Sequence, residues 1–190
     1  MTSDTTSGTG RSASEVLAGI DLTGRTAVVT GGYSGLGLAA TRALAGAGAR
    51  VVVPARRPDS AEQVLADTQG VEVDRLDLAD VNSVRAFAER FRRRQTTLDI
   101  LIANAGIMAC PETRVGPGWE AQFATNHLGH YTLTQLVWPT LAAAGAARVV
   151  SVSSGYSVDW RIIDDGPADD GEASRLWALS ANLTGLDLVH

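Results

Sequence analysis

Short apolar runs rich in β-branched residues alternate with amphipathic patterns along most of the chain. Near-continuous apolar runs of this kind are typical of parallel strands that are covered on both faces. We therefore predict five strands, at residues 26–30, 50–53, 71–76, 98–103 and 147–153.

The segments between these strands carry apolar residues three and four positions apart, which indicates helices. One helix is predicted directly after residue 35, and a second at about 60–68 with Ser60 as its N-cap. A third is expected to begin at Asp80. A longer helix is predicted over 119–143, and we expect Pro139 to kink it or to end its regular part.

The alternation of strands and helices predicts the fold class. Strand–helix–strand units with right-handed crossovers build an α/β fold, a doubly wound parallel sheet of the Rossmann type with strand order 3-2-1-4-5. Residues 1–14 are interpreted as a disordered tail and 15–190 as one domain of this fold. After residue 154 the pattern weakens, because the segment that follows is acidic and rich in turn-forming residues.

Composition narrows the range of functions. The chain has 190 residues, 45% hydrophobic and 19% charged, with a formal net charge of −5, which argues against nucleic acid or an anionic membrane as a partner. Cys110 is the only cysteine, and we find neither a signal peptide nor a membrane span, so a cytoplasmic protein is expected. All 16 positive residues are arginine, so no ammonium side chain is available for chemistry.

The segment TGGYSGLG, residues 30–37, follows a predicted strand and opens a predicted helix. In that position Gly31 suits a tight turn with positive φ, Gly35 a close approach of backbone to a pyrophosphate, and Gly37 close packing of the helix. The helix N-terminus would offer N–H groups to the phosphates. We predict a phosphate site formed by Gly31, Tyr33, Ser34, Gly35, Leu36 and Gly37. An ordinary strand–helix turn is the alternative.

The glycine spacing is TGxxxGxG, which resembles the short-chain dehydrogenase/reductase family. Four further segments resemble that family in the same order: LDL (76–78), NAG (104–106), NHLGHYTLT (126–134) and RVVSVSS (148–154). The resemblance covers residues 26–154, about two-thirds of the chain.

The resemblance implies roles for individual residues. Asp77, beside Leu78, would hydrogen-bond the adenine of a dinucleotide, and the backbone of Asn104, Ala105 and Gly106 would line the cofactor side of the site. Asn126 would help to hold a proton-relay water, and Ser154 would be the catalytic serine. Taken singly, each has a plainer interpretation, as a loop cap, a turn residue, a polar group on a helix face or a serine at a strand end.

Two other features bear on the ligand. After the second predicted strand the chain reads ARRPDS, and arginine there accommodates the 2′-phosphate of NADP, whereas an acidic residue would bind the ribose of NAD. Arg56 and Arg57 therefore favour NADP over NAD, although both side chains could belong to a solvated loop. His127 and His130 have a spacing compatible with a metal, but without a matching carboxylate cluster we assign them to packing and predict no metal site.

The family's Tyr-x-x-x-Lys pair has no counterpart. Residues 162–183 resemble the insert of the retinol-dehydrogenase-like and protochlorophyllide-reductase-like branch. Anchoring the alignment on Trp177 places Ser180 and Thr184 at the pair, and anchoring it on Ala181 and Asn182 places Arg175 and Leu179 there. A tyrosine phenol with pKa about 10 is a poor base without a nearby cation.

The resemblance implies an NADP(H)-dependent oxidoreductase that acts on a small-molecule alcohol or carbonyl. Because the pair is absent and the family continues through further strands, we interpret the chain as carboxy-terminally truncated or degenerate, with little or no turnover. The alternatives are a non-catalytic NADP(H)-binding or interaction protein, and a damaged remnant. Homo-oligomerisation stays open.

Overall fold

The computed structural model describes residues 11–153 and 170–186. Their main element is a five-stranded parallel sheet with strand order β3-β2-β1-β4-β7. Its strands are β1 (Thr26–Val29), β2 (Arg50–Ala55), β3 (Val71–Arg75), β4 (Ile100–Ala103) and β7 (Arg148–Ser151). Because β7 is the fifth strand of this sheet in chain order, the predicted order 3-2-1-4-5 is confirmed.

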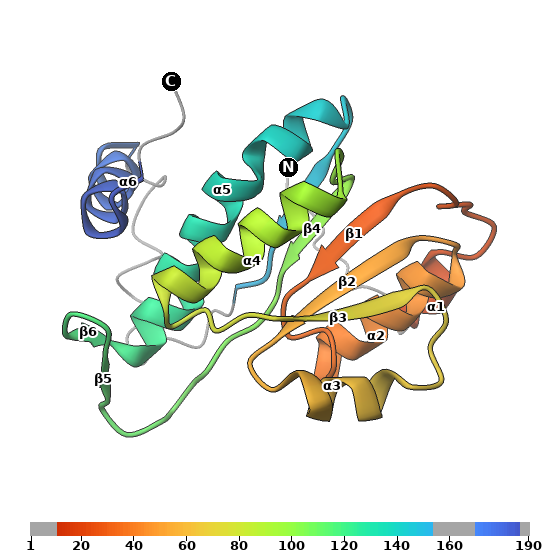
Figure 1. Cartoon of the computed structure of the whole chain (residues 1–190), viewed down its shortest axis with the longest axis horizontal. Coiled ribbons are helices and arrows are strands. Elements are labelled where there is room, and N and C mark those ends of the chain that lie inside the picture. The colour runs from red at the N-terminus through yellow and green to blue at the C-terminus, as the bar shows by residue number, and fades with distance from the viewer. Residues whose placement is uncertain (1–10, 154–169, 187–190) are drawn as a thin grey trace, which may run out of the picture.

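Helices cover both faces of the sheet (Figure 1). The helices between the strands are α2 (Gly35–Gly46), α3 (Pro58–Leu65), α4 (Val81–Arg94) and α5 (Gly129–Ala143). Side chains of α4 and α5 pack with Val28 and Val52 in one hydrophobic core, and those of α2 and α3 pack with Val29 and Val51 in the other. Successive residues of one strand therefore serve opposite cores, as the twofold period of a strand requires. This is why β1 is apolar after Thr26 and β2 is apolar after Arg50.

Several helix boundaries follow from local chemistry. Asp80 caps α4 as predicted, because its carboxylate accepts from the Asn82 N–H at 2.9 Å. The prediction for the second helix was wrong at its start: α3 begins at Pro58, not near Ser60. Proline is well placed in the first turn of a helix, where its missing N–H leaves no hydrogen bond unmade.

The long helix predicted over 119–143 is not continuous. Its first residues form the strand β6 (Trp119–Glu120), which pairs with β5 (Arg114–Val115) in a small antiparallel hairpin. A π-helical stretch, η1 (Phe123–Leu128), follows and leads directly into α5. Pro139 does not end the helix, because α5 continues to Ala143. The hairpin and the π-helical stretch carry no periodicity that would separate them from a helix in the sequence.

Two further helices flank this core. The short helix α1 (Ala13–Val16) begins within the last two residues of the predicted tail. A reciprocal capping box between Ser12 and Glu15 caps its N-terminus. At the other end α6 (Asp170–Thr184) packs against η1 and α5, with the Trp177 ring 4.9 Å from that of Tyr131. No helix of the described residues is long and apolar enough to cross a membrane.

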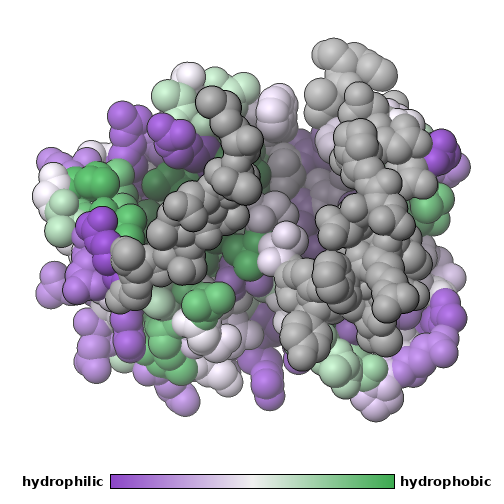
Figure 2. Space-filling model, turned by 180° about the vertical axis from the view of Figure 1, so that it is seen from behind, coloured by the Kyte–Doolittle hydropathy of each residue, from purple (hydrophilic) through white to green (hydrophobic). Residues whose placement is uncertain are grey.

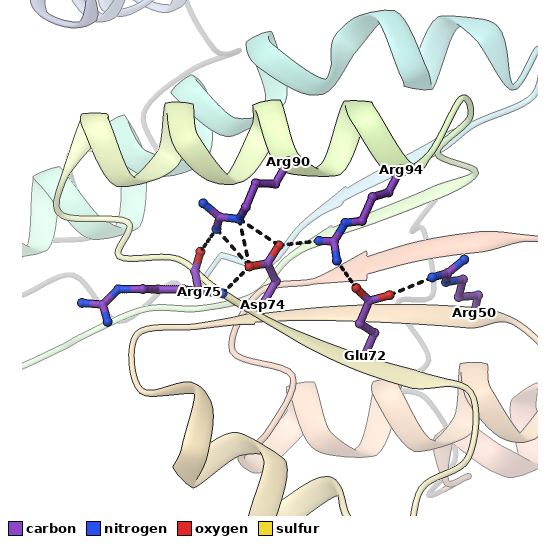
Figure 3. Close-up of polar contacts among 6 residues, drawn as sticks. All are labelled: Arg50, Glu72, Asp74, Arg75, Arg90 and Arg94. Carbon is purple, nitrogen blue, oxygen red and sulfur yellow. Dashed lines mark hydrogen bonds and ion pairs between the residues drawn. The ribbon is translucent and has the colours of Figure 1, made fainter.

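An ion-pair network ties α4 to the β3 edge of the sheet (Figure 3). The Asp74 carboxylate accepts from Arg90 at 2.9 Å and from Arg94 at 2.6 Å, while Glu72 pairs with Arg94 and with Arg50. The planar guanidinium group can contact two carboxylates at once, so arginine suits this bridging position better than lysine would.

The surface seen from behind mixes hydrophobic and hydrophilic residues (Figure 2).

Candidate functional site

A cleft of about 450 Å³ lies where the strands β1 to β4 and β7 end. In an open α/β sheet, ligands bind outside the carboxyl ends of the strands, where the connections diverge. The volume is within the range of pockets that hold small molecules and cofactors. The cleft is lined by Thr30, Gly31, Tyr33, Ser34, Gly35, Leu36, Pro54, Arg56, Leu76, Asp77, Leu78, Asn104, Ala105, Gly106, Ile107, Thr125 and Val152.

The glycine turn after β1 has the backbone that its sequence predicts. Gly31 has φ 65° and Gly35 has φ 49°, values that side-chain-bearing residues rarely adopt. A Cβ atom at Gly35 would meet no protein atom within 4 Å, so the backbone there faces open space. At Gly37 a Cβ would come within 2.3 Å of the Gly31 carbonyl oxygen, so this glycine permits close packing and does not line the cleft.

The first turn of α2 is open toward the cleft. Ser34 occupies the N-cap position, yet its side chain makes no capping hydrogen bond. The first-turn N–H groups of a helix need a partner, and the positive end of the helix dipole favours an anion there. Leu36, in the same turn, lines the cleft and exposes 78% of its surface. The turn is therefore suited to hold a phosphate by backbone N–H groups.

Thr30 joins the glycine turn to the loop after β4. Its hydroxyl oxygen accepts from the N–H groups of Asn104 at 2.9 Å and Ala105 at 3.0 Å. The Asn104 amide donates back to the Thr30 carbonyl oxygen at 3.0 Å. The two loops, which come from neighbouring strands, are thereby held together as one wall of the cleft.

The opposite wall comes from the segment after β3. Asp77 and Leu78 both line the cleft, as predicted for residues that would meet an adenine. The Asp77 carboxylate also accepts from the Ala79 N–H at 3.0 Å, as the plainer interpretation of a loop cap expects. A Cβ at Gly129 would lie 2.3 Å from the Leu78 carbonyl oxygen, so that glycine lets α5 approach this wall.

The two candidate arginines differ in position. Arg56 follows the last residue of β2 and lines the cleft, whereas Arg57 is the N-cap residue of α3 and does not. Both residues are exposed. Only Arg56 is therefore placed to meet a ligand in the cleft.

Of the two residues predicted for catalysis, the structure describes Asn126, which does not line the cleft. The Asn126 amide is paired with the backbone of Ile107, accepting from its N–H at 2.9 Å and donating to its carbonyl oxygen at 2.8 Å. Asn126 thus braces the loop beyond Asn104, and its neighbour Thr125 lines the cleft. Ser154 lies outside the described residues.

The two helical histidines make packing contacts. His127 stacks on Phe123 with ring centroids 5.2 Å apart and pairs with the Ser180 hydroxyl at 2.8 Å, and burial lowers its pKa. His130 pairs with Thr30 and with the Asn126 carbonyl oxygen. No group of three or more potential metal ligands occurs within the described parts of the chain.

The residues that two alignments placed at the Tyr-x-x-x-Lys positions do not line the cleft. Ser180 and Thr184 are buried, and their hydroxyls donate to carbonyl oxygens one turn earlier in α6. Among the described residues, none of α6 contributes to the cleft wall, Arg175 and Leu179 included.

Sequence reasoning missed several cleft residues. Thr30, Leu76 and Val152 lie inside the motifs but carried no assigned role, and Pro54, Ile107 and Thr125 gave no chemical signal. For all of these except Ile107 and Thr125, a position at the end of a strand was the only available indication. The sequence did identify eleven residues that line this cleft, whereas Gly37 and Arg57 lie outside it.

Comparison with known proteins places this geometry in a family. The model of the short chain dehydrogenase family matches residues 25–162. A probable oxidoreductase of Streptomyces antibioticus is 54% identical over 147 residues, which are 74% of this chain and 48% of that protein. Retinol dehydrogenase 12 of Mus musculus is 43% identical over 141 residues, 71% of this chain and 45% of that protein. The chain spans about half the length of the curated relatives it matches.

Solved structures of other proteins have a similar fold. The crystal structure of a putative uncharacterized protein from Mycobacterium paratuberculosis superposes with a TM-score of 0.75 at 26% identity, covering 96% of this chain and 100% of that one. The RhlG/NADP active-site complex of Pseudomonas aeruginosa gives a TM-score of 0.62 at 27% identity, covering 88% and 71%. With the family model, the relatives and the glycine-lined cleft in agreement, the chain belongs to the short-chain dehydrogenase family.

Proposed function

We propose that the chain binds NADP(H) in the cleft at the carboxyl ends of the strands. The observation that carries the proposal is the open first turn of α2, where Gly35 faces free space and Ser34 leaves the helix N-terminus uncapped. Backbone N–H groups in this arrangement bind phosphate without any lysine. A pyrophosphate is the anion that best matches a glycine turn between a strand and a helix.

The other cleft residues support the same ligand. Asp77 and Leu78 would contact the adenine, and the wall formed by Asn104, Ala105 and Gly106 would support the rest of the dinucleotide. Arg56 favours NADP over NAD, because a guanidinium group pairs with the 2′-phosphate. The similarity to a solved NADP complex is consistent with that preference.

Calorimetric titration with NADPH tests the binding proposal. We expect saturable binding to the purified chain and its loss in Gly35→Val, because a branched side chain would fill the space that the phosphates need. Gly24→Val is the matched control, since Gly24 also has positive φ (80°) with no atom near its Cβ but lies outside the cleft. Equal affinity in Gly35→Val and the parent would refute the phosphate cradle.

We further propose that the chain has the alcohol and carbonyl chemistry of its family in reduced form. A bound nicotinamide dinucleotide would supply or accept the hydride. Ser154 would donate a hydrogen bond to the reacting oxygen, while Asn126 would hold the neighbouring loop in place. Without a lysine to lower the pKa of a phenol, the proton has no efficient donor, and loss of a positioned general acid costs about 10²–10⁴-fold in rate.

Turnover assays separate this function from the alternative of a non-catalytic NADP(H)-binding or interaction protein. Under the proposal, retinoid, steroid and aldehyde panels give oxidation of NADPH that is slow but measurable above background. NADPH binding with no turnover at all favours the non-catalytic alternative. Sustained turnover that disappears in Ser154→Ala would overturn the expectation of low activity.

A further inference from the structure

The His130 side chain is buried and does not line the cleft. Both of its ring nitrogens form hydrogen bonds. It stands in the first turn of α5, directly behind the loops that form the cleft. Its Nε2 atom lies 2.8 Å from the Thr30 hydroxyl oxygen, and its Nδ1 atom lies 3.0 Å from the Asn126 carbonyl oxygen.

These two partners determine the protonation of the ring. A carbonyl oxygen only accepts hydrogen bonds, so Nδ1 must carry a hydrogen. Burial lowers the pKa of His130, outweighing the Asn126 hydrogen bond, which raises it, so the neutral ring is favoured. A neutral imidazole with hydrogen on Nδ1 has a bare Nε2. The Thr30 hydroxyl must therefore donate to His130.

The direction of that bond fixes how Thr30 meets the cleft loop. With its hydrogen committed to His130, the Thr30 oxygen keeps two lone pairs, and these face the N–H groups of Asn104 and Ala105. The other acceptor within reach of the Thr30 hydroxyl, the Ile102 carbonyl oxygen, is farther away at 3.4 Å. Both lone pairs and the hydrogen of Thr30 are then used.

The same helical stretch holds the loop at a second point. Asn126 lies four residues before His130, and its amide grips the N–H and carbonyl groups of Ile107. The loop over residues 104–107 is thus fixed near its start through Thr30 and at its end through Asn126.

We propose that His130 is a positioning residue that orders the 104–106 loop through Thr30, and that it does so as the neutral tautomer with hydrogen on Nδ1. The effect on ligand affinity rests on the proposed NADP(H) binding. The tautomer and the order of the loop are properties of the chain alone.

The tautomer is read directly by long-range ¹H–¹⁵N correlation spectra of uniformly labelled chain at pH 7.5 without ligand. The chain has three histidines, and the His130 signals are assigned by their disappearance in His130→Gln. We expect a protonated Nδ1 and an unprotonated Nε2. A hydrogen on Nε2 would overturn the proposal whether or not the chain binds NADPH.

Variants of Thr30 separate positioning from general stability. Thr30→Ser keeps the hydroxyl and should preserve slow exchange of the Asn104 and Ala105 amide protons, whereas Thr30→Val and His130→Leu should each accelerate it. Each of the latter two should weaken NADPH binding about 5- to 10-fold, the equivalent of one hydrogen bond, and the double variant should lose little more.

His127→Gln is the matched control, because His127 is on the same helical stretch but pairs with α6. It should leave the exchange of both loop amides unchanged. Equal exchange in Thr30→Ser and Thr30→Val, or fully additive losses in the double variant, would overturn the proposal. If the parent does not bind NADPH, the proposed function fails, and the spectra and exchange rates still decide the role of His130.

Discussion

Arg56 and Arg57 are neighbours in the chain, but their surroundings differ at the scale of single residues. Arg56 extends from the end of β2 into the cleft wall, and Arg57 begins α3 outside it. A pattern of two arginines after a strand cannot distinguish them, because the direction of each side chain depends on where the strand ends. The position of Pro58 in the first turn of α3 sets that boundary.

This difference predicts which arginine selects the ligand. Arg56→Ala should reduce the ratio of NADPH to NADH affinity at least about 10-fold, since a charge-assisted hydrogen bond contributes about 1.5–3 kcal/mol. Arg57→Ala, which removes the same charge next to it, should leave the ratio within about twofold. Titration of both ligands into the three proteins measures this. Equal effects of the two substitutions would contradict a specific role for Arg56.

The buried histidines predict how stability depends on pH. Burial lowers the folded-state pKa of His127 and His130 below the ordinary 6.5, so the unfolded chain binds more protons below about pH 6.5. The two neutral histidines therefore leave the free energy of unfolding at its full value above about pH 6.5. That free energy declines as the pH falls below this value, because protonation of both rings favours the unfolded chain. The carboxylates with lowered pKa, Glu15, Asp21 and Glu120, start from 3.8 to 4.5 and act only at lower pH.

Thermal unfolding between pH 7.5 and 5.5 tests this dependence. The midpoint should fall as the pH is lowered, and the fall should be shallower in His130→Gln, which retains His127 but removes the more buried ring. The comparison uses slopes, so a uniform loss of stability in the variant does not affect it. Parallel curves for the parent and His130→Gln would show that burial of His130 does not govern the pH response.

At the scale of elements, the contact between α4 and β3 consists mainly of ion pairs. Asp74 exposes 12% of its side chain and receives hydrogen bonds from Arg90, Arg94 and the Arg75 N–H (Figure 3). By contrast, Glu89 and Arg93 form an ion pair on the exposed face of α4, with 63% and 72% of their side chains exposed. These two sites offer a comparison within a single helix.

Asp74→Ala should destabilise the fold by about 1–3 kcal/mol, because it leaves two arginines without their shared carboxylate. Glu89→Ala should cost about 0.5 kcal/mol or less, as exposed pairs of this kind contribute little. Urea unfolding of the three proteins gives both values. A loss in Asp74→Ala no larger than in Glu89→Ala would mean that the network does not fasten α4 to the sheet.

The elements also show how far the sequence predicts this fold. The central strands β1, β2 and β4 follow from apolar runs, because a strand covered on both faces needs them. The order of the sheet follows from the right-handed crossovers of a doubly wound fold. Pro54 concealed the end of β2, since proline lacks an N–H; it is tolerated because the pairing of β2 with β1 has already ended at Val52. The hairpin of β5 and β6 and the π-helical η1 depend on tertiary contacts and left no periodic signal.

At the scale of the whole molecule, the cleft results from the topology. Segments far apart in sequence meet there because parallel strands present their carboxyl ends on one side of the sheet. Eleven of the residues that line it were predicted from the motifs that carry the family resemblance or from the arginine pair after β2. The support behind the wall, in particular His130 and its bond to Thr30, became visible only in three dimensions.

Amide hydrogen exchange with and without NADPH tests most directly the proposal that this cleft holds NADP(H). We predict that saturating NADPH slows exchange in residues 31–37, 76–78 and 104–107, and that Gly35→Val abolishes this protection while Gly24→Val keeps it. Exchange that NADPH leaves unchanged in all three segments, or slows only elsewhere, such as along α4, would contradict the account.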